Sequence, residues 1–503
     1  MQKTAIIISL LSLISAYTVN ELNLYWLKKD AVELRSNETV KTADDVSYIR
    51  PAQNYLDHGE LKANIAGNGA YFLRSPGYPL VFVALGSIFE KENVLSALKS
   101  VQLLLYSLSI YCLFFIAYQF LDSKKWAVLI TGFYGISTIS SGFLYYTLTE
   151  SLTPALVIFF VFFLLLAKNQ TNQKRKYVLY YLAAVIFSFL FITRPVLGIL
   201  GLAFPFFLFV DFWKRKITFF IQLFLVGFIA SSGMIVWQIR NWNITNEIVG
   251  LHPIYYPENS QSSFRPTHEA LWDLCKGWGE DGADFHSYVG PFWSASIHGH
   301  PTDEDIDKII NNFPKDVVTE LKRERLEKMF RSYQLSILNQ KYYYDNQLPM
   351  PKEIPNIEIK TIHQIKELTT NFKHHFWFQY YVSSPLKVYK ELAFHSNLSF
   401  YMFQKTYRGN PIMETLRLIC FAIHSLAFIT LIFSLFLRTP IHLKSIFSYA
   451  LIIYVFFLIF IQRGIEERYT LPVLSLALVS FGYLLKRLES LILPIIYSKK
   501  LKE

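Results

Sequence analysis

Long apolar runs alternate with short basic connectors along most of this chain. Runs of about 18 or more apolar residues with few charges are typical of helices that cross a membrane. The pattern predicts about ten spans, at residues 5–27, 95–121, 126–148, 151–167, 178–193, 195–212, 217–239, 416–437, 445–462 and 470–486. We therefore predict an all-α polytopic membrane protein.

Two long polar segments, residues 28–93 and 241–413, interrupt the apolar runs. The second is far too long for a plain connector. Its stretches DEDIDKIINNF and DVVTELKRERLEKMFRSYQLSILNQ carry apolar residues at helical spacing. We predict three parts: a transmembrane module at 1–240 with its first loop at 28–93, a mostly helical extracytoplasmic domain at 241–413, and C-terminal spans with a tail at 414–503.

Lysines and arginines gather in the short connectors between the predicted spans. The positive-inside rule makes these connectors, and both chain termini, cytoplasmic. Segments 28–93 and 241–413 then lie on the extracytoplasmic face. The net charge of +11 thus reflects topology, and we predict no nucleic-acid partner. The basic connectors contain Lys124 and Lys125; Lys174, Arg175 and Lys176; Lys214, Arg215 and Lys216; Lys486 and Arg487; and, in the tail, Lys499, Lys500 and Lys502.

Composition agrees with a membrane protein, since 52% of the 503 residues are hydrophobic and only 17% are charged. A signal peptide is an alternative for the first run, because Leu13 to Ala16 ends on small residues. The run continues through Trp26, so we favour a retained anchor. Cys275 alone among the three cysteines lies outside the predicted spans, which excludes a disulfide framework there. The Lys-, Asn-, Ile- and Phe-rich composition favours a bacterial inner membrane.

Adjacent carboxylates open an amphipathic stretch beside the first span, in TADDVSYIRPAQNYLDHGEL at residues 42–61. Apolar residues in it follow helical spacing, which predicts a helix along the membrane surface with Asp44 and Asp45 in its first turn. One explanation is helix capping, because Thr42 and Asp45 have the spacing of a capping box. Capping accounts for Asp45 better than for Asp44.

Other ionisable residues recur at the predicted extracytoplasmic ends of spans. Such groups are expensive at the edge of a membrane and often functional, although a single arginine there could simply anchor a helix at the interface. Acids and arginines together on one side resemble a site for an anionic lipid headgroup. They are Arg74, which precedes a short apolar helix predicted to end at Phe89, and Glu150, Arg194, Arg240, Arg463, Glu466, Glu467 and Arg468.

The order of these residues resembles the GT-C glycosyltransferases, especially the branch of bacterial protein O-mannosyltransferases and the lipid A aminoarabinose transferase. In that branch an acidic pair precedes a Tyr, an Ala-containing helix and a Gly in the first outer loop. Here Asp44, Asp45, Tyr48, Ala52 and Gly59 match, with Asp in place of the usual second Glu. The resemblance covers the chain well up to Asn241 and is weak across 241–413.

Later elements of the same pattern follow in order. A Lys/Arg-Pro element is matched by Arg74, Pro76, Gly77 and Pro79, and an acid near the third or fourth span by Glu150. An Arg-Asn pair after the seventh span is matched by Arg240 and Asn241, and an Arg-Tyr-x-x-Pro element by Arg468, Tyr469 and Pro472. Each motif alone has low specificity; their order and common side are more specific.

The resemblance implies a GT-C-like bundle that transfers a sugar from a polyprenyl-phosphate donor to an extracytoplasmic hydroxyl. It implies Asp44 as the general base, with Asp45 and Glu150 in the catalytic set, and inversion at the sugar. Arg74, Arg194, Arg240 and Arg468 are the predicted ligands of the donor phosphate, because a guanidinium fork suits phosphate oxygens. The donor needs no nucleotide site, and no glycine-rich phosphate loop occurs.

The sequence also bears on cofactors, on the acceptor and on alternative functions. His298, His300, Asp303 and Asp305 have a spacing that could bind a divalent ion but lack a recognised ligand framework, so we predict no metal or other cofactor. The acceptor is a glycan, a lipid or a protein, and membrane lipids surround the spans. The alternatives are a transporter or flippase, a polymerase or ligase for lipid-linked glycans, and a non-catalytic receptor.

Overall fold

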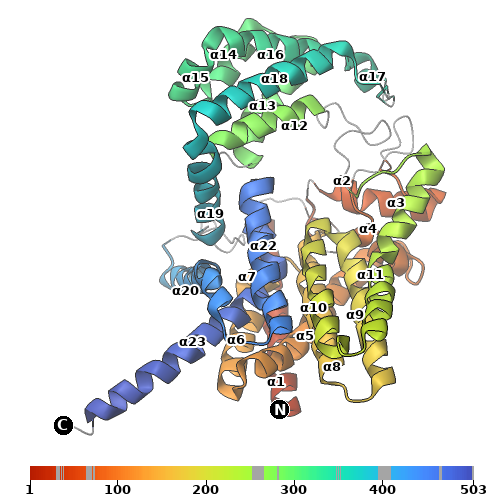
Figure 1. The fold of residues 1–503 in the computed structure, drawn as a ribbon. Coiled ribbons are helices and arrows are strands. Elements are labelled where there is room, and N and C mark those ends of the chain that lie inside the picture. Colours follow the sequence, from red (N-terminus) through yellow and green to blue (C-terminus); the bar gives the residue numbers. More distant parts are fainter. Residues whose placement is uncertain are drawn as a thin grey trace.

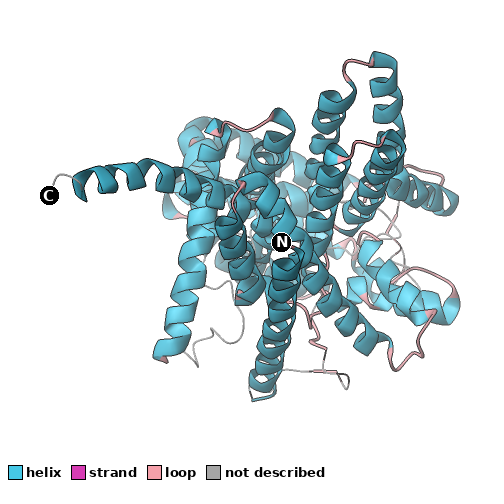
Figure 2. Ribbon diagram, turned by 90° about the horizontal axis from the view of Figure 1, so that it is seen from below, coloured by secondary structure: helices cyan, strands magenta, loops and turns pink. Residues whose placement is uncertain are grey.

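The computed structural model describes residues 1–29, 34–35, 37, 39–42, 44–63, 71, 74–251, 266–279, 282–346, 348, 350–351, 353–394, 409–463 and 467–500. These residues are almost entirely helices and the loops between them, and none forms a strand (Figure 2). Two isolated bridge pairs, Leu34 with Val40 and Val40 with Tyr146, are the extended contacts that occur among them. The predicted all-α class is therefore confirmed.

Eight helical segments in the described part of the chain are long and apolar enough to cross a membrane. They coincide with eight of the predicted spans, so the chain is a multi-pass membrane protein. The segments are α1 (Gln2–Lys29), α5 (Val94–Leu121), α9 (Gln173–Thr193), η2 (Pro195–Leu202) with α10 (Ala203–Phe212), α11 (Lys216–Thr245), α20 (Pro411–Ile429) with η8 (Thr430–Phe436), α21 (Ile441–Lys444) through α22 (Leu451–Phe456) to η10 (Phe457–Gln462), and η11 (Glu467–Thr470) with α23 (Leu471–Lys500).

The other two predicted spans are shorter helices. Segment 126–148 is divided into α6 (Lys124–Ile136) and α7 (Thr138–Ser141), because Ser137 leaves the helical conformation and its hydroxyl accepts a hydrogen bond from the Ile139 amide. Segment 151–167 is α8 (Thr153–Asn169), which is apolar but only 17 residues long. A total of about ten spans thus stays a prediction.

The first helix is an integral part of the bundle. It packs against α5, α6 and α7, and two of its polar residues form hydrogen bonds across those contacts. The hydroxyls of Ser9 and Ser107 lie 2.9 Å apart, and the Asn20 amide donates to the Ser141 carbonyl at 2.8 Å. Interhelical hydrogen bonds of this kind replace the hydrophobic driving force that is missing between helices in lipid.

Three short helices of the first loop cover one end of the bundle. They are α2 (Asp45–Tyr48), α3 (Arg50–His58) and α4 (Gly77–Gly86). Pro51 in the first turn of α3 and Gly59, which ends it with φ +76°, set its length. The predicted helices of this loop are present, with the first divided into α2 and α3 and Asp44 just before α2; that they lie along the membrane surface stays a prediction. They share a small core that contains Ile49, Ala52, Tyr78, Phe82, Val94, Leu98 and Leu152.

A separate helical unit, hereafter the cap, lies beyond the end of the bundle opposite the N terminus (Figure 1). It has its own hydrophobic core, and α19 (Ser384–Phe394) connects it to α20. The helices predicted from DEDIDKIINNF and DVVTELKRERLEKMFRSYQLSILNQ are confirmed as its α14, α15 and α16. The cap comprises α12 (Pro266–Cys275), η4 (Lys276–Trp278), α13 (Gly282–Ile297), α14 (Asp303–Asn311), α15 (Lys315–Leu321), α16 (Arg323–Leu338), α17 (Lys341–Asp345) and α18 (Asn356–His375).

A close crossing of α4 and α9 supplies a test of this arrangement. A β-carbon at Gly77 would lie 2.6 Å from the Thr193 backbone. Overpacking of this kind costs about 1–3 kcal/mol, so Gly77→Ala should lower the thermal unfolding midpoint in detergent. Gly132→Ala is the control, because a β-carbon there meets nothing within 4 Å. Equal midpoints for the two variants would contradict the crossing.

Candidate functional site

A cavity of about 880 Å³ lies between the bundle and the cap. We call it the polar cavity. Its floor consists of charged residues of the bundle and first loop, and its roof of residues from α12 and η4 of the cap. The floor residues are Asp44, Arg74, Glu150, Arg194 and Arg468, and the roof residues are Glu269, Trp272 and Lys276.

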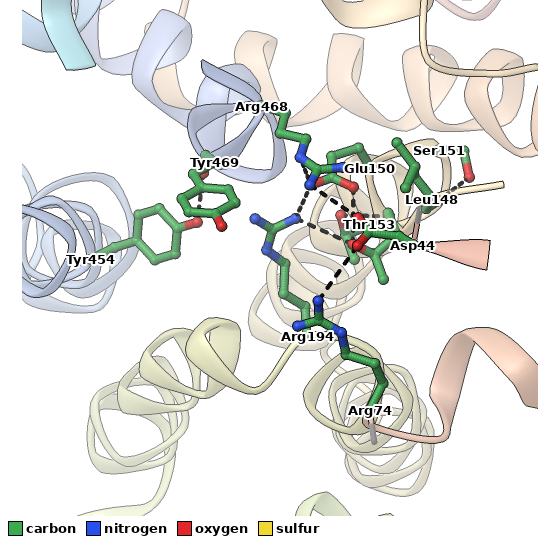
Figure 3. Close-up of polar contacts among 11 residues, drawn as sticks. Asp44, Arg74, Leu148, Glu150, Ser151, Thr153, Arg194, Tyr454, Arg468 and Tyr469 are labelled. Atoms are coloured by element: carbon green, nitrogen blue, oxygen red, sulfur yellow. Dashed lines mark hydrogen bonds and ion pairs between the residues drawn. The ribbon is translucent and has the colours of Figure 1, made fainter. Parts of the chain in front are cut away.

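The carboxylate of Asp44 faces this cavity and binds two guanidinium groups. Arg468 donates to it at 3.1 Å and Arg74 at 3.5 Å (Figure 3). Asp44 immediately precedes α2, and its backbone carbonyl accepts from the Ser47 amide at 2.9 Å. The hydroxyl of Thr42 has no hydrogen-bond partner among the described residues, so the capping contact expected from Thr42 is not formed. The Asp44 side chain thus contacts arginines rather than capping a helix.

Glu150 is the buried acid of the floor. It lies in the short turn η1 (Thr149–Ser151), where Arg194 donates to it at 2.5 Å and Arg468 approaches to 3.8 Å. Burial alone would raise the pKa of Glu150, but the two guanidinium groups outweigh it and hold the pKa below its ordinary value. Glu150 is therefore ionised at neutral pH, with its side chain only 3% exposed.

A helix break directs Arg194 into the cavity. Pro195 disfavours the helical conformation for the residue before it, and Arg194 is extended, with φ −146° and ψ 94°, between α9 and η2. Its guanidinium lies 5.0 Å from the centre of the Tyr469 ring. Burial lowers the pKa of Arg194, but Glu150 raises it by more, so this side chain stays charged.

Arg468 joins the two acids of the floor. It contacts both Asp44 and Glu150 from η11, at the start of the last span. The turn that carries it is fixed by Tyr454, whose hydroxyl donates to the Tyr469 carbonyl at 2.6 Å. The floor thus brings together three guanidinium groups and two carboxylates from four distant parts of the sequence.

The roof residues were not predicted from the sequence. Glu269, Trp272 and Lys276 stand three and four positions apart, which places them on one face of α12 and η4. That spacing was the only available signal, and it is shared by any amphipathic helix. Tyr48, whose hydroxyl pKa is raised by burial, also lines the cavity one turn after Asp44.

Arg240 lies outside the polar cavity, although it was predicted to bind phosphate. Its guanidinium donates to the Leu61 carbonyl at 2.7 Å and the Tyr71 carbonyl at 3.2 Å, and it lies 4.6 Å from the Trp237 ring centre. It fastens the first loop to α11. Arg463 is likewise outside the floor, and donates to the Lys276 carbonyl at 3.3 Å. The side chains of Asp45 and Glu467, and all of Glu466, lie outside the described residues.

The possible metal ligands of the cap serve structural contacts. The Asp305 carboxylate completes a capping box with Thr302 at the start of α14, and Asp303 pairs with Arg331 at 3.1 Å. No group of three or more His, Cys, Asp or Glu residues that could hold a metal ion occurs in the described ranges. The three cysteines are buried, and no disulfide joins them in the described part of the chain.

No protein-family model, no curated protein and no solved structure matches this chain. The function proposed below therefore rests on the site itself. Its features are a polar cavity at one end of a membrane bundle, an accessible carboxylate paired with arginines, and a buried acid that holds Arg194.

Replacement of Glu150 by Gln should destabilise the protein. The substitution leaves Arg194 buried without its counter-charge, and breaking a buried ion pair costs about 3–5 kcal/mol. Thermal unfolding of the purified protein in detergent measures the loss. Glu304→Gln is the control, because Glu304 pairs with Lys308 on the surface of the cap, and its midpoint should equal that of the wild type.

The ion pair of Glu150 with Arg194 also makes the stability of the protein depend on pH in a defined direction. The pKa of Glu150 is lower in the folded protein than its ordinary value of 4.5, so its ionised form contributes stability above pH 4.5. That contribution disappears as the pH falls through the folded-state pKa. The difference between wild type and Glu150→Gln should shrink below pH 4.5; a constant difference down to pH 3 would contradict the pairing.

Proposed function

We propose that this protein is a GT-C-type glycosyltransferase that passes a sugar from a polyprenyl phosphate to an acceptor hydroxyl on the extracytoplasmic side. The observation that carries the proposal is the pairing of Asp44 with Arg74 and Arg468 at the wall of the polar cavity. A base and cations for a phosphate leaving group are the two requirements of this reaction.

The charge of the floor suits a phosphate diester. Three guanidinium groups face two carboxylates among the described lining residues, which leaves one positive charge. A sugar joined to a polyprenyl phosphate carries one negative charge. As the bond from the sugar to the phosphate oxygen breaks, a second charge develops on that phosphate, and preformed guanidinium donors stabilise it without reorganisation.

The two acids of the floor differ in the way that the reaction requires. Asp44 is 24% exposed and its contacts are 3.1 and 3.5 Å long, whereas Glu150 is 3% exposed and tightly paired. An acceptor can therefore reach Asp44 but not Glu150. We assign Asp44 as the general base and Glu150 as a positioning residue that holds Arg194 and Arg468.

The proposed step is a single displacement. The acceptor oxygen attacks the anomeric carbon while its proton passes to the Asp44 carboxylate, and the bonding electrons leave with the phosphate oxygen. Because a hydroxyl has a far higher pKa than a carboxylate, proton transfer accompanies attack rather than preceding it. One displacement without a carboxylate nucleophile inverts the configuration of the sugar.

A second, apolar cavity supports a lipid-linked donor. Its volume is about 270 Å³, and its lining includes Phe187, Gly201 and Gly227. It shares Phe191 and Gly198 with the polar cavity. An apolar space that adjoins the polar cavity suits a polyprenyl chain whose phosphate lies on the cationic floor.

The position of the floor favours a transferase over a transporter. Transporters bind substrate near the bilayer midplane between internal repeats, whereas this cavity is lined in part by α12 and η4 of the cap, and the cap lies beyond the end of the bundle (Figure 1). A polymerase or ligase for lipid-linked glycans shares the donor class and is distinguished by its product.

Asp44→Asn should abolish transfer. It removes the proton acceptor while keeping the shape, and general-base catalysis contributes about 10²–10⁴-fold. Membranes from cells that carry wild type or variant are profiled for glycans, glycolipids and glycoproteins by mass spectrometry. The variant, at normal expression, should lose one sugar from one product.

Asp57→Asn is the control, because Asp57 is an acid of the same loop that pairs with Lys91 at the surface. Identical profiles for Asp44→Asn and wild type would overturn the proposal.

Gly227→Leu should block the lipid tail of the donor. A β-carbon at Gly227 meets nothing within 4 Å, so leucine fits without strain and fills the apolar cavity. Affinity for a long-chain polyprenyl phosphate, measured by native mass spectrometry, should fall about tenfold, while geranyl phosphate binds as before. Gly132→Leu adds the same side chain in open space on α6, outside both cavities, and should change neither affinity. Unchanged long-chain binding to Gly227→Leu would exclude this path.

A further inference from the structure

The roof of the polar cavity carries an ammonium group beside a flat aromatic ring. The Nζ of Lys276 lies 5.4 Å from the centre of the Trp272 ring, and both residues line the cavity with Glu269. A lysine beside an indole offers a cation and an apolar face together, which is a combination suited to a charged ligand with a ring or chain.

Lys276 forms no ion pair with a carboxylate of the described residues. Within the described part of the chain, no carboxylate lies within 4.0 Å of its Nζ. Asp273, one turn earlier on α12, is occupied by Lys373 at 3.0 Å and by the Tyr380 hydroxyl at 2.9 Å. Burial lowers the pKa of Lys276 by more than the nearby acids Asp273 and Glu269 raise it.

The neighbourhood of the roof has one positive charge in excess. Lys276, Lys373 and Arg463 are its described cations, and Glu269 and Asp273 are the described acids near them. Arg463 is satisfied by neutral groups, because it lies 4.4 Å from the Tyr380 ring centre and donates to backbone carbonyls. Around Lys276 the described charges are thus three cations and two carboxylates, whereas the roof itself gives the cavity lining one of each, Lys276 and Glu269.

The position of Lys276 is fixed from both sides of the cavity. Its backbone carbonyl accepts hydrogen bonds from Ser384 at 2.5 Å and from Arg463, which follows the end of η10 in the bundle, at 3.3 Å. Lys387 donates to the nearby Trp278 carbonyl at 3.0 Å. The backbone that carries Lys276 is thus held at the cavity before any ligand arrives, which reduces the cost of ordering on binding.

We propose that Lys276, beside Trp272, binds an acidic group of the acceptor, so that the sugar is passed to a hydroxyl of a phosphate- or carboxylate-bearing molecule. This inference rests on the proposed glycosyltransferase function and names its acceptor class. The floor neutralises the donor phosphate and the roof neutralises the acceptor. Lys276 acts in acceptor recognition and not in the displacement.

The test uses acceptor material from cells that lack this protein. Their envelope extract is separated by anion exchange into neutral and acidic fractions, and each is incubated with membranes that contain wild type, Lys276→Gln, Lys276→Arg or Lys308→Gln. Mass spectrometry measures addition of the sugar that Asp44→Asn cells lack. Lys308 lies on the exposed face of α14, outside the cavity, so Lys308→Gln is the matched control.

The expected result is that the acidic fraction alone accepts the sugar. Lys276→Gln should lower the rate at limiting acceptor about tenfold or more, Lys276→Arg should restore most of it, and affinity for long-chain polyprenyl phosphate should stay unchanged. Treatment of the acidic fraction with hydrofluoric acid, which cleaves phosphate esters, distinguishes a phosphate from a carboxylate.

Three outcomes would overturn this inference but not the proposed transferase. They are transfer to the neutral fraction, full activity of Lys276→Gln, and loss of polyprenyl phosphate binding by Lys276→Gln. No transfer by wild type to either fraction would overturn both.

Discussion

The site depends on Arg468, a single guanidinium group shared by two carboxylates. Without it, among the described cations, Asp44 would keep only its longer contact with Arg74, and Glu150 would keep only Arg194. Arg468 therefore sets the distance between an acid that reaches the cavity and an acid that is buried. The remaining local structure serves this contact: the break before Pro195, the turn fixed by Tyr454, and the short helices of the first loop.

Stability alone is a poor reason for such an arrangement. Well-packed apolar residues of similar volume usually stabilise a protein as well as a buried ion pair does, because desolvation offsets most of the Coulomb attraction. Glu150 and Arg194 are almost fully enclosed, and they make the floor more polar than its packing requires. The proposed phosphate site accounts for this desolvation cost, because hydrogen-bond donors that are fixed in advance do not reorganise during the reaction.

Particular residues show what the sequence could predict. Apolar runs and the Pro-Gly turn at Pro76 were sufficient for most helices, and the order of acids and arginines brought Asp44, Arg74, Glu150, Arg194 and Arg468 into one hypothesis. Arg240 lies elsewhere because a position at the end of a span does not fix the direction of a side chain around the helix. Ser137 divides an expected span, because a hydroxyl cap outweighed apolar residues that continue beyond it. Trp272 and Lys276 were missed because their roles depend on how the cap is placed over the bundle.

The location of Arg468 also has a consequence for how the protein is made. Asp44 and Glu150 are synthesised early, whereas Arg468 begins the last membrane helix, more than three hundred residues after Glu150. During translation the early helices enter the membrane while both acids still lack this partner. The floor is completed only when the final helix is inserted. A chain interrupted before that point has both acids but lacks the guanidinium group that joins them, so the floor can assemble only after this helix has been made.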